Sequence, residues 1–225
     1  MFCLDVVFFQ SAISQNKKIL ALNFDEPEYL RKEMQKKYYM IDPYLPAQKA
    51  FVTILSSADD TVYANTSCFD TSSYKYGNYI SLTLYRKGSL SRNLFVIKLD
   101  TALCTDKRYR IRYDSKYHMY TNYQVDSLQV LFVKEENDIK RWLAGKPFNG
   151  MYVDFSLARV NNRRWQSVAK DFVSDGDYRY MVIGNLKDDE PTGVNKVNNC
   201  PYSKKPKGYW DYSELFVGNI FIDEY

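Results

Sequence analysis

Period-two alternation of apolar and polar residues, repeated in segment after segment, is the feature that most constrains the fold of this chain. Three clear cases are residues 79–86, 93–100 and 108–114. In the last of these, Tyr109 and Ile111 alternate with arginines. Because successive side chains of a strand point to opposite faces, this pattern predicts sheets with one buried face and one wet face.

The same pattern continues toward the C-terminus. Further strands are predicted at 125–133, around 153–155, at 165–172, around 178–182 and at 215–223. In the last strand we expect Phe216, Ile220 and Ile222 on one side, with Val217, Phe221 and Asp223 on the other. About nine or ten short strands with turn-rich links predict a β-sandwich or barrel.

One helix and three long loops complete the expected pattern. Residues 26–38 carry glutamate–lysine pairs four positions apart and an early proline, which predicts a short N-terminal helix. The loops are expected at 56–76, 134–150 and 186–212. Loops of such length in a compact domain are functional or mobile. We expect Trp165, which lies beside apolar strand residues, to belong to the core.

Composition excludes several classes of protein. The chain has 225 residues, 45% hydrophobic and 26% charged, which is ordinary for one globular domain. No stretch approaches the ~20 apolar residues of a membrane-spanning helix. The net charge of +4 is spread along the chain, and the basic run at 204–207 is typical of a solvated loop, so nucleic acid is not an expected partner.

The first fifteen residues resemble an export signal. An apolar run from Phe2 to Phe9 is followed by small residues and Gln15. We therefore expect cleavage of residues 1–15 and one domain over 16–225; the alternative is a short buried N-terminal strand. The mature chain would keep Cys68, Cys104 and Cys200, which allow at most one disulfide.

Aromatic residues make up 16% of the chain, including 21 tyrosines. Tyrosine suits half-buried sheet surface and also ligand surfaces, because its ring buries area while its hydroxyl stays wet. Sugar rings have apolar faces that stack on such rings, while amides and carboxylates bind the hydroxyls. The candidate ligand-binding residues are Trp210, Trp142, Tyr209, Tyr76, Tyr120, Asn122 and Asp211. For each ring, packing in the core or under a loop is the alternative.

The order of motifs resembles a galactose-binding-like jelly roll, a carbohydrate-binding-module type of domain found in secreted Gram-negative envelope proteins. The matching pieces lie at 76–85, 93–117, 123–132, 164–186 and 221–225, about two-thirds of the chain. This resemblance implies a two-sheet antiparallel β-sandwich whose first and last strands are neighbours. It also implies a structural calcium ion between those strands, with Asp25, Glu26 and Asp223 as candidate ligands. Solvated acids at the strand ends are the alternative.

Catalytic motifs are weak. A Ser-His-Asp triad would need His118, the chain's one histidine, and no Gly-x-Ser-x-Gly elbow is present. A two-carboxylate hydrolase has acids available but no specific pair. We therefore expect a non-catalytic binding module for carbohydrate that is secreted, periplasmic or associated with the outer membrane of the cell envelope. The alternatives are a protein-interaction component of the envelope and, ranked lower, a hydrolase.

Overall fold

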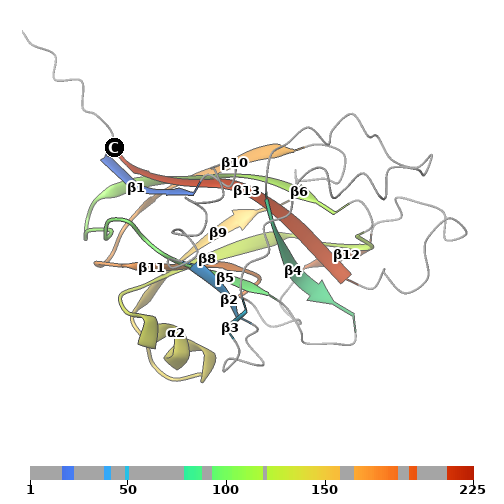
Figure 1. Ribbon diagram of the computed structural model, residues 1–225, viewed down its shortest axis with the longest axis horizontal. Coiled ribbons are helices and arrows are strands. Elements are labelled where there is room, and N and C mark those ends of the chain that lie inside the picture. Colours follow the sequence, from blue (N-terminus) through green and yellow to red (C-terminus); the bar gives the residue numbers. More distant parts are fainter. Residues whose placement is uncertain are drawn as a thin grey trace, which may run out of the picture.

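The computed structural model describes residues 17–22, 38–41, 49–50, 79–87, 93–118, 121–157, 165–186, 193–196 and 212–225. Two antiparallel sheets lie one above the other, and a helix packs below the lower sheet (Figure 1). This is the jelly-roll β-sandwich that the sequence predicts. Among the described residues, no helix is long and apolar enough to cross a membrane.

The upper sheet has five strands. These are β1 (Lys17–Leu22), β4 (Ile80–Arg86), β6 (Arg108–Tyr117), β10 (Gln166–Val173) and β13 (Tyr212–Glu224). Their order is β1-β13-β6-β10, and β4 pairs with the first half of β13 while β1 pairs with its second half. The first and last strands are therefore neighbours, as the resemblance to galactose-binding-like jelly rolls implied.

The lower sheet has six strands in the order β3-β2-β5-β11-β8-β9. Their bounds are β3 (Lys49–Ala50), β2 (Tyr38–Ile41), β5 (Leu94–Lys98), β11 (Tyr180–Gly184), β8 (Ser127–Val133) and β9 (Gly150–Ser156). A separate pair joins β7 (Tyr123–Val125) to β12 (Val194–Lys196). The strand β12 lies inside the segment 186–212 that was predicted as a loop, so that part of the prediction is wrong.

The main core lies between the two sheets and follows the predicted alternation. In β4, Ile80, Leu82 and Leu84 are buried, and their neighbours are partly exposed. In β6 the inward residues include Tyr109 and Ile111. Tyr117 ends the inward row, and its hydroxyl donates to the carbonyl of Val125 (2.8 Å) and accepts from that residue's N–H (3.1 Å).

A second apolar cluster corrects the expectation of one wet face per sheet. Leu94, Val96, Leu131, Val133 and Val182 are buried on the outer face of the lower sheet. Strands β5, β8 and β11 are therefore apolar on both faces. The cover is a helix, α2 (Glu136–Leu143), which contributes Ile139 to the cluster.

The helix α2 also corrects the prediction of a loop at 134–150. Asp138 begins it by accepting a hydrogen bond from the Glu135 backbone N–H (3.1 Å). Gly145 ends it with a φ of 63°, a left-handed conformation that glycine adopts without strain. The N–H of Lys146 then bonds the carbonyl of Arg141 (2.9 Å), which closes the helix end. Capping residues lie at both ends of this sequence, but the segment was predicted as a loop because its composition is typical of turns.

A bulge corrects the predicted faces of β13. Val217 pairs with Ser115 but Ile220 pairs with Tyr113, so β13 has one extra residue at this point. The extra residue reverses the alternation. Val217 therefore lies in the core with Ile220, while Phe216 lies on the outer side.

Two other expectations have definite outcomes. Trp165 directly precedes β10 and is only partly buried, with its ring 5.6 Å from that of Tyr79, so it is not a core residue. The predicted helix at 26–38 lies outside the described residues apart from Tyr38, which begins β2. The predicted loop at 56–76 and residues 1–15 also lie outside the described residues.

Candidate functional site

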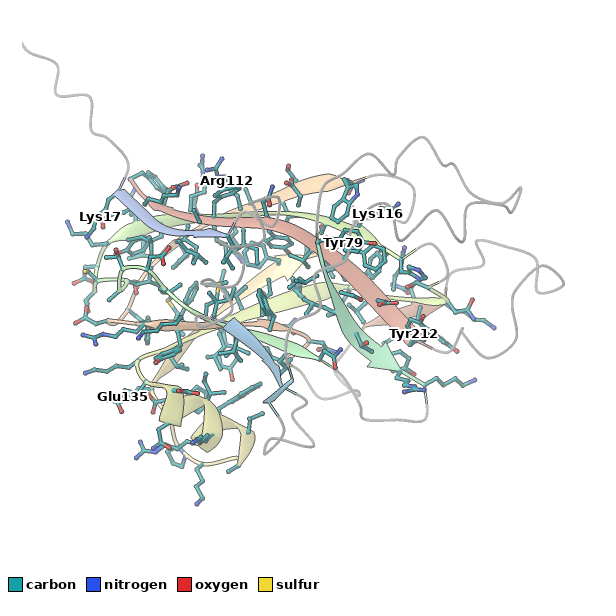
Figure 2. The ribbon with its side chains drawn as sticks, viewed as in Figure 1. Lys17, Tyr79, Arg112, Lys116, Glu135 and Tyr212 are labelled. Carbon is teal, nitrogen blue, oxygen red and sulfur yellow. The ribbon has the colours of Figure 1, made fainter. Side chains whose placement is uncertain are left out.

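The outer face of the five-stranded sheet carries a row of arginines. Within β6 the sequence Arg-Tyr-Arg-Ile-Arg-Tyr places Arg108, Arg110 and Arg112 at alternate positions. Their neighbours Tyr109 and Ile111 fill the core, so the strand's orientation is fixed by burial. Figure 2 shows Arg112 on the upper side of the sandwich, away from the space between the sheets.

Strand pairing brings acidic and aromatic residues beside two of these arginines. Arg110 lies opposite Asp223 on β13 and opposite Asp171 on β10. One row further along, Arg112 lies opposite Phe221 on β13. Cross-strand neighbours on one face are close enough for side-chain contact.

Arg110 is held from two sides. Its Nε and Nη2 atoms donate to the two carboxylate oxygens of Asp171, at 2.5 and 2.8 Å. Its guanidinium lies over the ring of Tyr225, 5.5 Å from the centroid. The hydrogen bond from Arg110 lowers the pKa of Asp171 below its ordinary value, and a hydrogen bond from Tyr225 acts in the same direction. Tyr225 thus links β13 to β10 across the arginine.

Arg112, two positions further along β6, also pairs with a carboxylate and packs against an aromatic ring. Its Nη2 donates to a carboxylate oxygen of Asp223 at 2.8 Å, and its guanidinium lies 5.5 Å from the ring centroid of Phe221. A pocket of about 440 Å³ is lined by Arg110, Arg112, Asp223 and Tyr225. The two arginine units therefore share one concave site.

These ion pairs orient the side chains and add little to stability. Both arginine side chains are about half exposed, at 51% each. Exposed ion pairs are typically worth only about 0–1 kcal/mol because water and salt screen them. What they provide is a fixed guanidinium plane, packed on an aromatic ring and open to solvent.

The sequence-predicted site residues have several outcomes. Asp223 lies on this face, paired with Arg112. Asn122 is only 2% exposed, so its amide lies in the interior and not on a wet surface as expected. The other predicted residues lie outside the described part of the chain: Trp210, Tyr209, Tyr76, Tyr120, Asp211, Asp25 and Glu26.

Trp142 lies on the opposite side of the sandwich. It belongs to α2, not to a polar loop as expected, and packs partly buried against the second apolar cluster. The rings of Phe148 and Tyr152 lie nearby, with their centroids 6.3 Å apart in an edge-to-face arrangement. The Trp142 side chain hydrogen-bonds Tyr152. Tyr152 is 48% exposed. These three rings form a smaller aromatic surface between α2 and β9.

A buried polar cluster occupies the other end of the five-stranded sheet. Lys116 is 1% exposed and His118 is 6% exposed, and the Nδ1 of His118 lies 3.8 Å from a carboxylate oxygen of Glu214. Burial lowers the pKa of His118 to about 4, and the positive charge of Lys116 adds to this. His118 is therefore neutral at pH 7. Ser81 donates a hydrogen bond to Glu214.

Metal ligands do not gather in the described part of the chain. Across its residues, no three His, Cys, Asp or Glu side chains lie close enough together to hold an ion. Asp223, the one candidate calcium ligand there, already pairs with Arg112. Calcium binding thus stays a prediction. Cys104 is a free, exposed thiol, while Cys68 and Cys200 lie outside the described residues.

Sequence reasoning missed most of the arginine face. Arg110, Arg112, Phe221 and Tyr225 were not named as ligand residues. The available signal was the alternation of arginine with buried residues in β6, which places three positive charges on one wet face of the strand. Their partners on β10 and β13 are distant in sequence and carried no signal of their own.

Neither a protein-family model nor a curated protein matches this sequence. Solved structures do match its fold. They include the CBM22-1 xylan-binding domain of Paenibacillus barcinonensis Xyn10C, at 9% identity and a TM-score of 0.45 over 93% of this chain and 95% of that one. The family 11 carbohydrate-binding module of Clostridium thermocellum matches at 11% identity and 0.45, over 92% and 95%.

An enzyme is similar in fold as well. The Stig cyclase Fisc from Fischerella matches at 10% identity and a TM-score of 0.49, over 94% of this chain and 98% of that one. The chain is thus similar in fold to carbohydrate-binding modules and to a cyclase. A shared fold of this kind does not say what the chain binds.

Proposed function

We propose that this chain is a non-catalytic carbohydrate-binding module whose ligand lies on the outer face of the five-stranded sheet. The observation that carries the proposal is the pocket formed by Arg110, Arg112, Asp223 and Tyr225. Sugar sites combine apolar faces for ring stacking with a few fixed polar groups. Here Tyr225 and Phe221 supply rings, and the guanidiniums and Asp223 supply hydrogen-bonding groups held in place by ion pairs.

The position of the face supports the same function. Arg110, Arg112 and Asp223 lie on the paired strands β6 and β13, and Tyr225 directly follows β13. A site on strands is more rigid than one on loops, so little order is lost when a ligand binds. Its open shape suits a section of a polysaccharide chain. Binding is expected to be weak, because the ligand stays partly exposed to water.

The proposal includes a place of action outside the cytoplasm, in the secreted or envelope-associated setting that the N-terminal sequence predicts. Native protein should then begin near Asn16, and amino-terminal sequencing measures this. An intact Met1 in the native host would contradict export without affecting the sugar site. Binding without turnover is a further expectation, tested by looking for shortened products after long incubation with each bound glycan.

A matched pair of tyrosines tests the site. Tyr225 and Tyr152 have nearly equal exposure, 49% and 48%, but lie on opposite sides of the sandwich. A glycan array followed by titration calorimetry should find a ligand whose affinity falls in Tyr225→Ala and stays unchanged in Tyr152→Ala. The reverse result would move the site to the surface formed by Trp142, Phe148 and Tyr152. Absence of any glycan ligand would favour the protein-interaction alternative.

A further inference from the structure

We propose that the carbohydrate bound on this face is acidic, a polymer of uronic acids whose carboxylates are held by Arg110 and Arg112. The inference rests on the proposed sugar-binding function and specifies its ligand class. Three observations carry it: the hydrogen-bond donors that Asp171 and Asp223 do not engage, the charge around the pocket, and the orientation of the two guanidiniums.

The pocket holds more donors than acceptors. A guanidinium has five N–H donors and no acceptor. Asp171 accepts two hydrogen bonds from Arg110, and Asp223 accepts one from Arg112. Most donors of both arginines are therefore not used by these carboxylates. Sugar hydroxyls both donate and accept, whereas a carboxylate only accepts, so a carboxylate matches this site better.

The surrounding charge favours an anion. Arg108 is exposed in the same outward row as Arg110 and Arg112. On the neighbouring strand β1, Lys18 is exposed and pairs in register with Asp223. Three carboxylates offset part of this positive charge: Asp171 and Asp223, each engaged by one arginine, and Asp114, which follows Arg112 in the same outward row. Against the four basic side chains they leave an excess of one positive charge. Opposite charge on an exposed face attracts a polyanion in a salt-dependent way.

The two guanidiniums are spaced for a repeating ligand. Residues two positions apart on one strand lie about 7 Å apart. Tyr225 and Phe221 each pack against one guanidinium and limit its rotation. Planar guanidinium forks bind carboxylates through paired, charge-assisted hydrogen bonds, which are about twice as strong as neutral ones. A polymer with a carboxylate on every sugar ring can present two such groups to this pair.

The test compares polygalacturonate with its fully methyl-esterified form by titration calorimetry. The parent chain should bind the acid and bind the ester at least about tenfold more weakly, because charge-assisted hydrogen bonds are lost. Raising the salt concentration should weaken binding of the acid only. Dextran sulfate serves as a polyanion without carboxylates and should bind more weakly than polygalacturonate.

A matched pair of arginines gives the control. Arg112→Gln should reduce the affinity for polygalacturonate about tenfold or more. Arg112→Lys keeps the charge but loses the planar fork, so its affinity should lie between those of the parent and Arg112→Gln. Arg141→Gln removes the same charge from α2. The Arg141 side chain is 54% exposed, close to the value for Arg112, and it likewise makes one ion pair. Arg141→Gln should bind like the parent. Unchanged melting temperatures would confirm that all variants are folded.

The outcomes separate the two proposals. Equal binding of the acid and the ester would overturn the acidic-sugar inference and leave the sugar-binding function standing. Equal losses in Arg112→Gln and Arg141→Gln, or equal binding of dextran sulfate, would reduce the interaction to general charge attraction and overturn it too. Binding to no glycan, acidic or neutral, would overturn the proposed function itself.

Discussion

His118 should make the stability of this domain depend on pH between about 6.5 and 4. The side chain is almost fully buried beside Lys116, Glu214 and the ring of Phe216, which lies 5.1 Å away. Burial, and secondly the charge of Lys116, lowers its pKa from 6.5 to about 4 in the folded chain. The unfolded chain therefore binds a proton at a higher pH than the folded chain does.

The sign and size follow from this difference. The contribution of neutral His118 to the free energy of unfolding is fully present above pH 6.5. It is lost as the pH decreases toward 4, because the unfolded chain then binds a proton more readily than the folded chain. A shift of 2.5 pH units corresponds to about 3 kcal/mol in total, and to about 2 kcal/mol at pH 5. For a domain of this size, a loss of that order is a large fraction of the folding free energy.

The measurement is urea unfolding of the parent and of His118→Gln at several pH values from 7.5 to 4.5. Carboxylates also titrate near the lower end, so the quantity that matters is the difference between the two proteins. The parent should lose about 2 kcal/mol more than His118→Gln between pH 7.5 and pH 5. Parallel pH profiles would refute the claim that burial keeps this imidazole neutral. They would indicate instead that Glu214 stabilises its charged form.

Three further predictions concern other parts of the molecule. The buried hydroxyl of Tyr113 has no hydrogen-bond partner among the described residues, so Tyr113→Phe should leave the free energy of unfolding unchanged or raise it by about 1 kcal/mol. Tyr117→Phe loses two hydrogen bonds to Val125 and should lower the free energy of unfolding by about 1–2 kcal/mol. Urea unfolding distinguishes the two variants, and equal effects would contradict the assigned hydrogen bonds. Trp142→Ala should cost about 2 kcal/mol because the ring packs against the second apolar cluster, and it should leave polygalacturonate affinity unchanged; a loss of affinity without a loss of stability would make Trp142 a ligand residue. Calcium should raise the melting temperature if it binds Asp223, and more so in Arg112→Gln, where the carboxylate has lost its ion pair; identical melting temperatures in calcium and in chelator for both proteins would contradict a calcium site.

The strands were predictable because burial imposes a local period. In β6, tyrosine and isoleucine alternate with arginine, and the structure buries the apolar set. The same reasoning was incomplete for β5 and β8, whose second face is covered by α2. The run from Leu94 to Ile97 is apolar throughout, and its sequence does not say which element covers the second face.

The candidate site was predictable only in part. Asp223 was named as a calcium ligand, and the structure pairs it with an arginine. That contact depends on the register between β6 and β13, and it joins two residues that are 111 positions apart in sequence. The bulge between Val217 and Ile220 also sets which residues of β13 reach the outer face. Neither long-range register nor a bulge leaves a periodic signal in the sequence.

The most direct test of the central claim is to map the bound sugar on the molecule by NMR. An isotope-labelled chain would be titrated with a short oligogalacturonate while amide, arginine side-chain and indole signals are followed. The account predicts that the shifts concentrate on Arg110, Arg112, Phe221 and Tyr225, with the Trp142 indole unchanged. Shifts that concentrate on Trp142 and Tyr152, on the opposite side of the sandwich, would contradict it.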